Sequence, residues 1–396
     1  MANKYLKEES ELFELEPKSV LNPLNAFRVI KKLAKTWEEI SKEIQSDLAE
    51  NYLKNISNQR ETRFPNEDDL NGAIQGLLRL QDTYKLKTKD LANGIVEDIN
   101  INKQMDDPLY PNATNNSKLY EQELLANGVN EEDFRSNIPP LNNTRMSSGY
   151  EELCRGENEI SITEISKLYC YYKMDRPFLR LAPIKVEIIR FEPLAVIFRN
   201  VIYDEEIEIM QNISLPKLQR SLLINYSTGV SSPSRYRVSK NAWISVKIHP
   251  IVKQIAKRLK LMTNLNLKSA EPLQDSNFTM ETGDRIATVL FYLSTPKKGG
   301  YTVFTDIKTV AKPTKNDALF WYNMLRSVDI DWRTRHAACP VLLGDKWAMN
   351  CFIHEKSEEF VRPCGLDPSI EERYVGDLGG PEPRKYPNIS PYCNEG

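Results

Sequence analysis

The residues best suited to metal or acid–base chemistry are the chain's three histidines, His249, His336 and His354. His336 lies ten positions before Lys346 in an apolar, strand-like stretch. Such a pair suits a site that holds a metal and an anion, because imidazole binds Fe(II) and an ammonium group binds a carboxylate as a point charge. Taken alone, a single histidine among apolar residues is more often a buried, hydrogen-bonded side chain, and a single lysine is more often a surface residue.

The composition is that of a globular protein. The chain has 396 residues, of which 40% are hydrophobic and 27% charged, and its formal net charge is −2. This length allows two or three domains with sizeable cores. Lysine and arginine are spread along the sequence, so no nucleic-acid partner is predicted. No apolar run approaches the ~20 residues of a membrane span, and the N-terminal residues lack the apolar segment of a signal peptide.

Two features point to a secretory compartment. The first is a set of Asn-x-Ser/Thr sequons, which predict a glycoprotein, although an asparagine-rich chain also produces sequons by chance. They begin at Asn55, Asn112, Asn115, Asn142, Asn212, Asn225, Asn277 and Asn388. The second is the cysteines, Cys154, Cys170, Cys339, Cys351, Cys364 and Cys393. Their spacing does not reveal a pairing, and six reduced cysteines in a cytosolic protein are the alternative.

The first 149 residues divide into a helical part and a linker. Residues 1–95 are predicted to be helical, with one helix from Asn25 to about residue 54 and a second over about 68–84. The first helix carries a heptad seam of Ile30, Leu33, Trp37, Ile40 and Ile44. Residues 96–149 are rich in Asn, Asp, Pro and Ser, which predicts a polar linker.

Residues 150–365 are predicted to be rich in strands. Period-two alternation and short β-branched runs indicate strands over 183–191, part of 193–202, 285–293, 301–304, 317–322 and 346–354, with helices over 204–212 and 249–263. This pattern favours an α+β fold, in which an N-terminal α-helical segment precedes a double-stranded β-helix (jelly-roll) domain buttressed by helices. Residues 366–396, rich in Pro and Gly, are predicted to be a disordered tail.

Residues 150–365 resemble the catalytic domain of the α subunits of collagen prolyl 4-hydroxylase, which are Fe(II)/2-oxoglutarate dioxygenases. The stretches that carry the resemblance are Tyr150–Glu157, Tyr236–Trp243, Gly283–Thr288, Leu290–Tyr292, Gly299–Phe304, Phe320–Asn323 and Thr334–Trp347. Residues 22–27 and 78–86 resemble parts of the family's N-terminal dimerisation segment. The alternative for those helices is a pair that packs within one chain.

The resemblance implies procollagen-proline 4-dioxygenase activity with 2-oxoglutarate, O2, Fe(II) and ascorbate. By position, His336 would be the distal iron ligand, Lys346 would bind the far carboxylate of 2-oxoglutarate, and His354 would assist 2-oxoglutarate binding and decarboxylation. The family also implies a proline-rich or collagen-like peptide substrate, protein disulfide isomerase as β subunit, an α-subunit dimer and the endoplasmic reticulum lumen. Disulfides Cys154–Cys170 and Cys339–Cys364 are implied in the same way.

The chain departs from the family pattern in two places. The family's other two iron ligands form a His-x-Asp pair, whose members point the same way from one strand, and this chain contains neither His-x-Asp nor His-x-Glu. The strand that carries the pair is expected to be missing between Ser269 and Gly283, where Asp275, Glu281 and Asp284 offer carboxylates without a histidine two positions before them.

The second departure is the peptide-binding helical repeat domain of the family, which residues 96–149 are too short and too polar to form. These two absences predict weak Fe(II) binding and negligible proline hydroxylation. The alternative function is a catalytically dead interaction or dimerisation subunit of the same complex. A non-functional product, from splicing or a faulty gene model, is a third reading.

Overall fold

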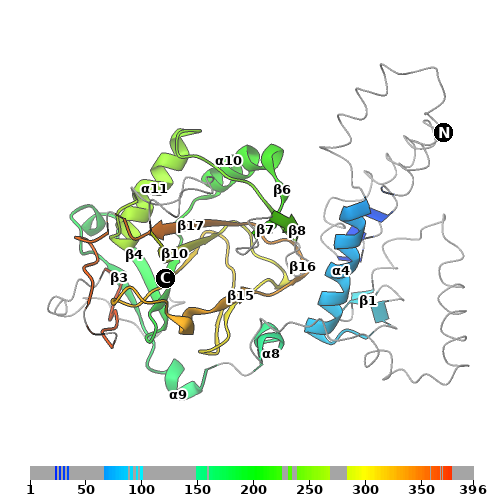
Figure 1. The fold of residues 1–396 in the computed structure, drawn as a ribbon, viewed down its shortest axis with the longest axis horizontal. Helices are drawn as coiled ribbons and strands as arrows, with labels where there is room; N and C mark the ends of the chain where they lie inside the picture. The colour runs from blue at the N-terminus through cyan, green and yellow to red at the C-terminus, as the bar shows by residue number, and fades with distance from the viewer. Residues whose placement is uncertain are drawn as a thin grey trace, which may run out of the picture. The chain divides into compact units, whose positions relative to one another are not determined.

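The computed structural model of the chain divides into two compact units, residues 1–148 and 149–396 (Figure 1). It describes seven positions between 23 and 34, residues 67–87, parts of 90–100, and residues 149–376 except 158–159, 225–230, 234–238, 268–282, 357, 366 and 368. No helix in these ranges is long and apolar enough to cross a membrane.

In the first unit, helix α4 (Glu67–Tyr84) confirms the second predicted helix. Leu80 on α4 is buried, whereas Ile74 and Leu78 are exposed. Strands β1 (Ile95–Val96) and β2 (Ile99–Asn100) form an antiparallel pair. Most of the predicted helix that ends near residue 54 lies outside the described residues, as do the linker residues 101–148, so both stay predictions.

The second unit combines helices with antiparallel sheets. Its described helices are α8 (Tyr150–Cys154), α9 (Ile162–Ile165), α10 (Asp204–Ser214) and α11 (Pro250–Thr263), with the 3-10 helices η3 (Phe178–Arg180), η4 (Leu215–Lys217) and η5 (Trp332–Thr334). Its described strands are β3 (Cys170–Lys173), β4 (Ile184–Arg190), β5 (Ala195–Arg199), β6 (Gln219–Arg220), β7 (Leu222–Ile224), β8 (Ser231–Pro233), β9 (Lys240–Asn241), β10 (Arg285–Tyr292), β11 (Lys298–Gly299), β12 (Thr302–Phe304), β13 (Thr309–Ala311), β14 (Ala318–Tyr322), β15 (His336–Ala338), β16 (Val341–Leu343) and β17 (Ala348–His354).

Two of the sheets position the candidate site. The larger has six strands in the order β17-β10-β14-β5-β4-β3, and the smaller has three in the order β13-β12-β15. Strand pairing is antiparallel in both. Strands β10 and β14 are covered on both faces, which is why their sequences are continuous apolar runs rather than alternating ones.

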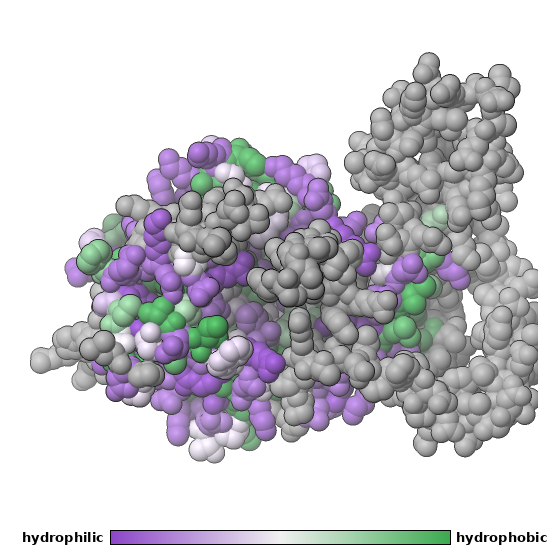
Figure 2. All heavy atoms as spheres, viewed as in Figure 1, coloured by the Kyte–Doolittle hydropathy of each residue, from purple (hydrophilic) through white to green (hydrophobic). Residues whose placement is uncertain are grey.

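The two faces of the larger sheet carry separate cores. Since side chains alternate along a strand, Val289 and Phe291 of β10 face the core that contains residues of α10 and α11. Leu290 and Tyr292 face a second core, shared with Phe304 of the smaller sheet. Figure 1 shows α10 and α11 together on one side of the strands. Figure 2 shows a mainly hydrophilic surface with small hydrophobic patches, as expected of a globular protein.

Most of the predicted strands and both predicted helices of this unit are confirmed, with ends displaced by a few residues. The predicted disordered tail is wrong for its first part. Glu372 and Val375 are buried, and Arg362 donates a hydrogen bond to Glu372 at 2.8 Å from Nε to Oε1. The apolar Val375 joins the core next to α11, and this burial orders a segment whose composition alone indicates disorder. Residues 377–396 lie outside the described residues.

Candidate functional site

His336 lies at the start of β15, with its ring against aromatic side chains of both sheets. The ring centroid lies 4.7 Å from that of Trp321 and 5.9 Å from that of Phe304. Nδ1 lies 2.9 Å from the carbonyl oxygen of Thr334. A carbonyl only accepts, so Nδ1 carries the proton and donates, which leaves the Nε2 lone pair for a metal or a proton.

His336 is an exposed residue by its accessible surface, although its ring packs against Trp321 and Phe304. The resulting desolvation lowers the pKa of His336, against the opposing effect of the hydrogen bond to Thr334. The imidazole is therefore neutral at neutral pH, which is the form that binds metal ions.

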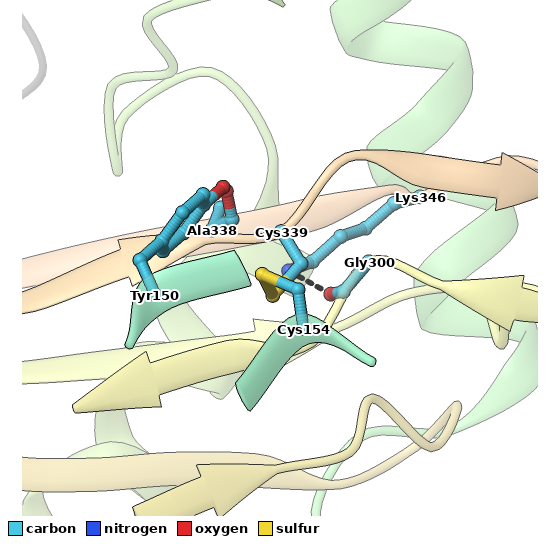
Figure 3. Close-up of a disulfide and its surroundings, with 6 residues drawn as sticks. All are labelled: Tyr150, Cys154, Gly300, Ala338, Cys339 and Lys346. Carbon is cyan, nitrogen blue, oxygen red and sulfur yellow. Dashed lines mark hydrogen bonds between the residues drawn. A yellow bond between two sulfur atoms is a disulfide. The ribbon is translucent and has the colours of Figure 1, made fainter. Parts of the chain in front are cut away.

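Lys346 lies between β16 and β17, and its side chain points toward Gly300 (Figure 3). Its Nζ donates a hydrogen bond to the Gly300 carbonyl at 2.5 Å and lies 5.6 Å from the ring centroid of Tyr292. Among the described residues, no carboxylate forms an ion pair with it. Burial lowers the pKa of Lys346 to about 8. A partly buried ammonium group whose described hydrogen-bond partner is a backbone carbonyl is suited to bind an anion.

Gly300 allows the lysine to approach the chain so closely. Its φ is +71°, and a Cβ at this position would lie 3.1 Å from Pro296, 3.2 Å from Val341 and 3.4 Å from Cδ of Lys346. A side chain here would be strained and would press on the aliphatic stem of the lysine.

Tyr292, whose ring lies near the lysine, is hydrogen-bonded to a second hydroxyl group. The Tyr292 hydroxyl and Thr302 Oγ1 are 3.1 Å apart, and both side chains are buried. Burial raises the pKa of Tyr292 well above its usual value, so the phenol stays protonated and can donate. An ammonium group with two hydroxyls matches the hydrogen-bonding needs of a carboxylate.

Lys346 and His336 face the same space between the sheets. Thr302 and Phe304 alternate on one face of β12, and they pair with Ala338 and His336 of β15. Thr302 is hydrogen-bonded to Tyr292, whose ring lies near Lys346, and Phe304 contacts the ring of His336. Two residues of a strand span about 7 Å. A ligand bound by Lys346 would therefore extend toward His336.

His354 and His249 lie apart from this pair. His354 is buried at the end of β17, opposite Arg285, with Nδ1 2.6 Å from the Gly283 carbonyl. Ala348, at the other end of β17, pairs with Tyr292. About 20 Å of strand therefore separates His354 from the surroundings of Lys346 formed by Tyr292, Thr302 and Gly300, which are called the lysine pocket below. The structure does not bring His354 together with Lys346, and the role of His354 in decarboxylation stays a prediction.

His249 has a structural role. Its Nδ1 accepts a hydrogen bond from the Ile251 backbone at 3.2 Å and caps α11, which packs on the opposite face of the larger sheet. The three histidines of the chain therefore occupy three separate places.

The described residues do not fit an Fe(II) centre. Around His336 they are Trp321, Phe304 and Thr334, none of which supplies a carboxylate or a second imidazole. No group of three or more His, Cys, Asp or Glu side chains in the described ranges is arranged to hold a metal. Asp275 and Glu281, two of the candidate carboxylates, lie outside those ranges.

A disulfide between Cys154 and Cys339 borders the site (Figure 3). It joins α8 to the residue after β15, with the Cα atoms 5.5 Å apart. Next to it, the Tyr150 hydroxyl donates to the Ala338 carbonyl at 2.8 Å, and the Cys339 N–H donates to Tyr301 at 2.8 Å. Because Cys339 lies between His336 and Lys346 in sequence, the disulfide anchors the segment that carries both.

The predicted pairs Cys154–Cys170 and Cys339–Cys364 are therefore wrong. Cys154 packs against the end of β15, whereas Cys170 lies in β3, at the far edge of the larger sheet, and forms a disulfide of its own. Cys364 is an exposed thiol. The spacing in sequence does not reveal these contacts because they depend on how the sheets pack.

The sequence interpretation missed the walls of the lysine pocket. Tyr292 lies near the end of the strand predicted over 285–293, and Gly300 belongs to a predicted turn, but neither was assigned a role. The signal that could have indicated the pocket is a polar Tyr and Thr at the ends of two otherwise apolar strands.

Comparisons with known proteins place the chain among 2-oxoglutarate oxygenases. Residues 1–98 match the profile described as prolyl 4-hydroxylase alpha-subunit, N-terminal region, and residues 270–354 match that of the 2OG-Fe(II) oxygenase superfamily. The chain is 39% identical to prolyl 4-hydroxylase subunit alpha-1 of Caenorhabditis elegans, with 99% of this chain and 88% of the relative covered. It is 31% identical to the Gallus gallus protein of the same name, with 87% of each covered.

The alignment with the nematode protein also gives the number of its residues that have no counterpart in this chain. It spans 494 positions, 98 more than the 396 residues of the chain, so at least 98 aligned residues of the relative have no counterpart here. Among solved structures, a viral collagen prolyl hydroxylase in complex with 2OG, from Paramecium bursaria Chlorella virus-1, is 20% identical. Its TM-score is 0.31, over 40% of this chain and 95% of that one.

Proposed function

Since the chain belongs to the family of prolyl 4-hydroxylase α subunits, we propose that it binds 2-oxoglutarate through Lys346 and hydroxylates peptidyl proline weakly or not at all. The observation that carries the proposal is the partly buried ammonium group of Lys346, which lies near the Tyr292 ring and has no described carboxylate partner. We further propose that the six-stranded and three-stranded sheets are the two halves of a jelly roll, with the ligand between them.

The far carboxylate of 2-oxoglutarate fits the lysine pocket by charge and by hydrogen bonding. Nζ of Lys346 would bind the carboxylate, and the Tyr292 and Thr302 hydroxyls would donate to it. Because these donors are buried, the contacts are less screened by water than a surface ion pair would be. The 2-oxo end would then face His336, about 7 Å along β12.

The separate positions of the three histidines limit Fe(II) binding at this site. In this superfamily, two histidines and a carboxylate bind Fe(II). This chain would use iron and ascorbate as the family does only if residues beyond the described ones supplied two ligands. No step of metal chemistry is assigned to the chain for this reason.

A second candidate function follows from the lack of described iron ligands around His336, namely a catalytically dead subunit that assembles through its N-terminal region. The family's partners are then the expected ones, namely a second α subunit, protein disulfide isomerase and a collagen-like peptide, in the endoplasmic reticulum lumen. The match of residues 1–98 to the α-subunit N-terminal region supports this candidate.

Calorimetry tests the first part of the proposal. 2-Oxoglutarate is titrated into the full chain in EDTA, and Lys346→Ala is expected to weaken binding at least tenfold, since a hydrogen bond to a charged group contributes about 1.5–3 kcal/mol. Lys312→Ala removes an exposed lysine near the Tyr301 ring and is the matched control. Equal binding by both variants would refute the role of Lys346.

Succinate release with Fe(II) and ascorbate tests the second part. The expected result is no His336-dependent turnover above the background of the His336→Ala variant. Turnover that is lost in His336→Ala would show that other residues complete the metal site, and the dead-subunit alternative would be rejected.

A further inference from the structure

The segment that follows β17 is bound to the part of the chain that leads into His336. Residues 358–365 and 369–376, called the strap below, lie beyond residues 270–354, which match the oxygenase profile. Residues 323–335, called the connection, run from β14 to β15. We propose that the strap positions His336 by fixing both ends of the connection, so that the site depends on residues outside the oxygenase-like region.

Arg362 of the strap fixes the first end of the connection. Its Nη2 donates to the Met324 carbonyl at 2.9 Å, and its Nη1 donates to the Leu325 carbonyl at 3.4 Å. The guanidinium also lies 4.5 Å from the ring centroid of Tyr322, the last residue of β14. Because a buried carbonyl without a donor is unfavourable, these contacts fix the place where the connection leaves the larger sheet.

Glu372 holds Arg362 in this orientation. Its Oε1 accepts from Nε of Arg362 at 2.8 Å and lies 2.6 Å from Nη2. Nη1 of Arg326, a residue of the connection, lies 4.0 Å from the same oxygen, and the Gly365 N–H donates to the Arg326 carbonyl at 2.8 Å. All three charged side chains are buried. A buried charge is costly without its partner, so the strap and the connection are kept together.

Glu371 fixes the second end of the connection. Its carboxylate lies 2.6 Å from Nη2 of Arg333, which belongs to η5. The next residue, Thr334, accepts a hydrogen bond through its carbonyl from Nδ1 of His336 at 2.9 Å. One ion pair, a short piece of backbone and one hydrogen bond therefore join the strap to the His336 ring.

The strap is itself anchored to the end of α11. Val375 packs in the core that contains residues of this helix. Gly376 has a φ of +83° and lies against the side chain of Asn264, the C-cap of α11, where a Cβ would clash. The Glu358 carboxylate accepts a hydrogen bond from the Asn266 N–H at 3.0 Å. With both of its ends attached to the same place, the strap is a fixed support for the connection.

His249 provides an internal reference that separates positioning from a general loss of packing. It caps the first turn of α11, the helix to whose other end the strap is anchored. A strap that positions His336 acts through the connection, so its disruption should move the His336 ring and leave His249 in place. A strap that only adds stability would loosen both histidines together.

NMR spectra of isotope-labelled histidine rings test the proposal in the full chain. The chain has three histidines, so His336→Ala and His249→Ala assign all three signals. The Trp321 ring, whose centroid lies 4.7 Å from that of His336, should displace the His336 signal by its ring current. In Arg362→Met most of this displacement should be lost. Arg362→Lys keeps the charge beside Glu372 without the guanidinium fork and should give an intermediate position.

Two further variants complete the test. Arg180→Met, which removes an exposed arginine of η3, is the matched control and should leave the His336 signal unchanged. Glu371→Gln breaks a partly exposed ion pair and decides the question if circular dichroism shows that Arg362→Met does not fold. Its His336 signal should move in the same direction by a smaller amount.

Three results would overturn the inference. They are a His336 signal that stays in place in folded Arg362→Met or, where that variant does not fold, in Glu371→Gln, an equal shift in Arg180→Met, and a His249 shift as large as that of His336. The inference does not rest on the proposed function, because the histidine signals are measured without 2-oxoglutarate. A chain that fails to bind 2-oxoglutarate by calorimetry would reject the lysine pocket and leave the strap to be decided by these spectra.

Discussion

The Cys154–Cys339 disulfide closes a large loop, and its removal should destabilise the second unit measurably. The two residues are 185 positions apart. For a loop of that length, loop-closure entropy alone predicts a loss of about 5 kcal/mol, and observed effects are more often 2–4 kcal/mol. The smaller figure is expected here, because a second disulfide at Cys170 already restrains the unfolded chain.

The perturbation is the double variant Cys154→Ala/Cys339→Ala, since a single variant would leave one thiol to form a new pair. For a unit of 150–250 residues, each kcal/mol corresponds to about 2–4 °C in Tm. A fall of about 5–15 °C is therefore expected for the transition of this unit, followed by circular dichroism without reductant. Cys364→Ala is the control, because that thiol is exposed and unpaired, and it should leave Tm unchanged.

The disulfide should also affect the site. Cys339 follows β15 directly, and its backbone contact with Tyr301 lies next to Gly300, which accepts from Lys346. Loss of the anchor should weaken 2-oxoglutarate binding in the double variant, while Cys364→Ala binds normally. Peptide mapping under non-reducing conditions checks the pairing itself. A fragment that links Cys154 to Cys170, or a double variant with unchanged Tm, would refute the reasoning.

Three further predictions concern groups near the site and the core. Burial raises the pKa of Glu358 to about 7 from its ordinary 4.5, so the folded chain binds more protons than the unfolded one between these values. The free energy of unfolding should fall as pH rises from about 4.5 to 7, and urea titrations of Glu358→Gln should show a flatter profile. The pKa of Lys346 is lowered to about 8, so 2-oxoglutarate affinity measured by calorimetry should decrease between pH 7 and pH 9, and an unchanged affinity would argue that another cation binds the ligand. Gly300→Ala should reduce 2-oxoglutarate affinity and destabilise the fold by about 1–3 kcal/mol, because its Cβ would press on Pro296, Val341 and Lys346; Gly76→Ala in α4, where a Cβ meets nothing within 4 Å, is the control.

Local patterns were sufficient to predict most of the described elements. Strands β4 and β10 and helices α10 and α11 were predicted because alternation, apolar runs and helix-start signals lie within a few residues of each other. His336 and Lys346 lie near one another in the chain, at the start of β15 and just before β17, and their roles as ligands stay predictions.

Contacts between distant segments were not predictable in the same way. The Cys154 partner lies 185 positions away, and the neighbours of Lys346 come from β10, β12 and the turn at Gly300. The burial of Val375 depends on the core beside α11. Each of these follows from how the sheets and helices pack, which the spacing of residues in the chain does not record.

The proposed anion site at Lys346 and the proposed metal ligand His336 depend on different strands. The lysine pocket needs only β10, β12 and the segment that leads into β17, all of which are in place. A metal at His336 would need further ligands beside β15, and in the described part of the chain β15 lies at the edge of its sheet, with β12 on one side. Under the proposed function, a missing strand beside β15 would remove iron ligands and leave the surroundings of Lys346 in place. For this reason 2-oxoglutarate binding and turnover are separate measurements for this chain.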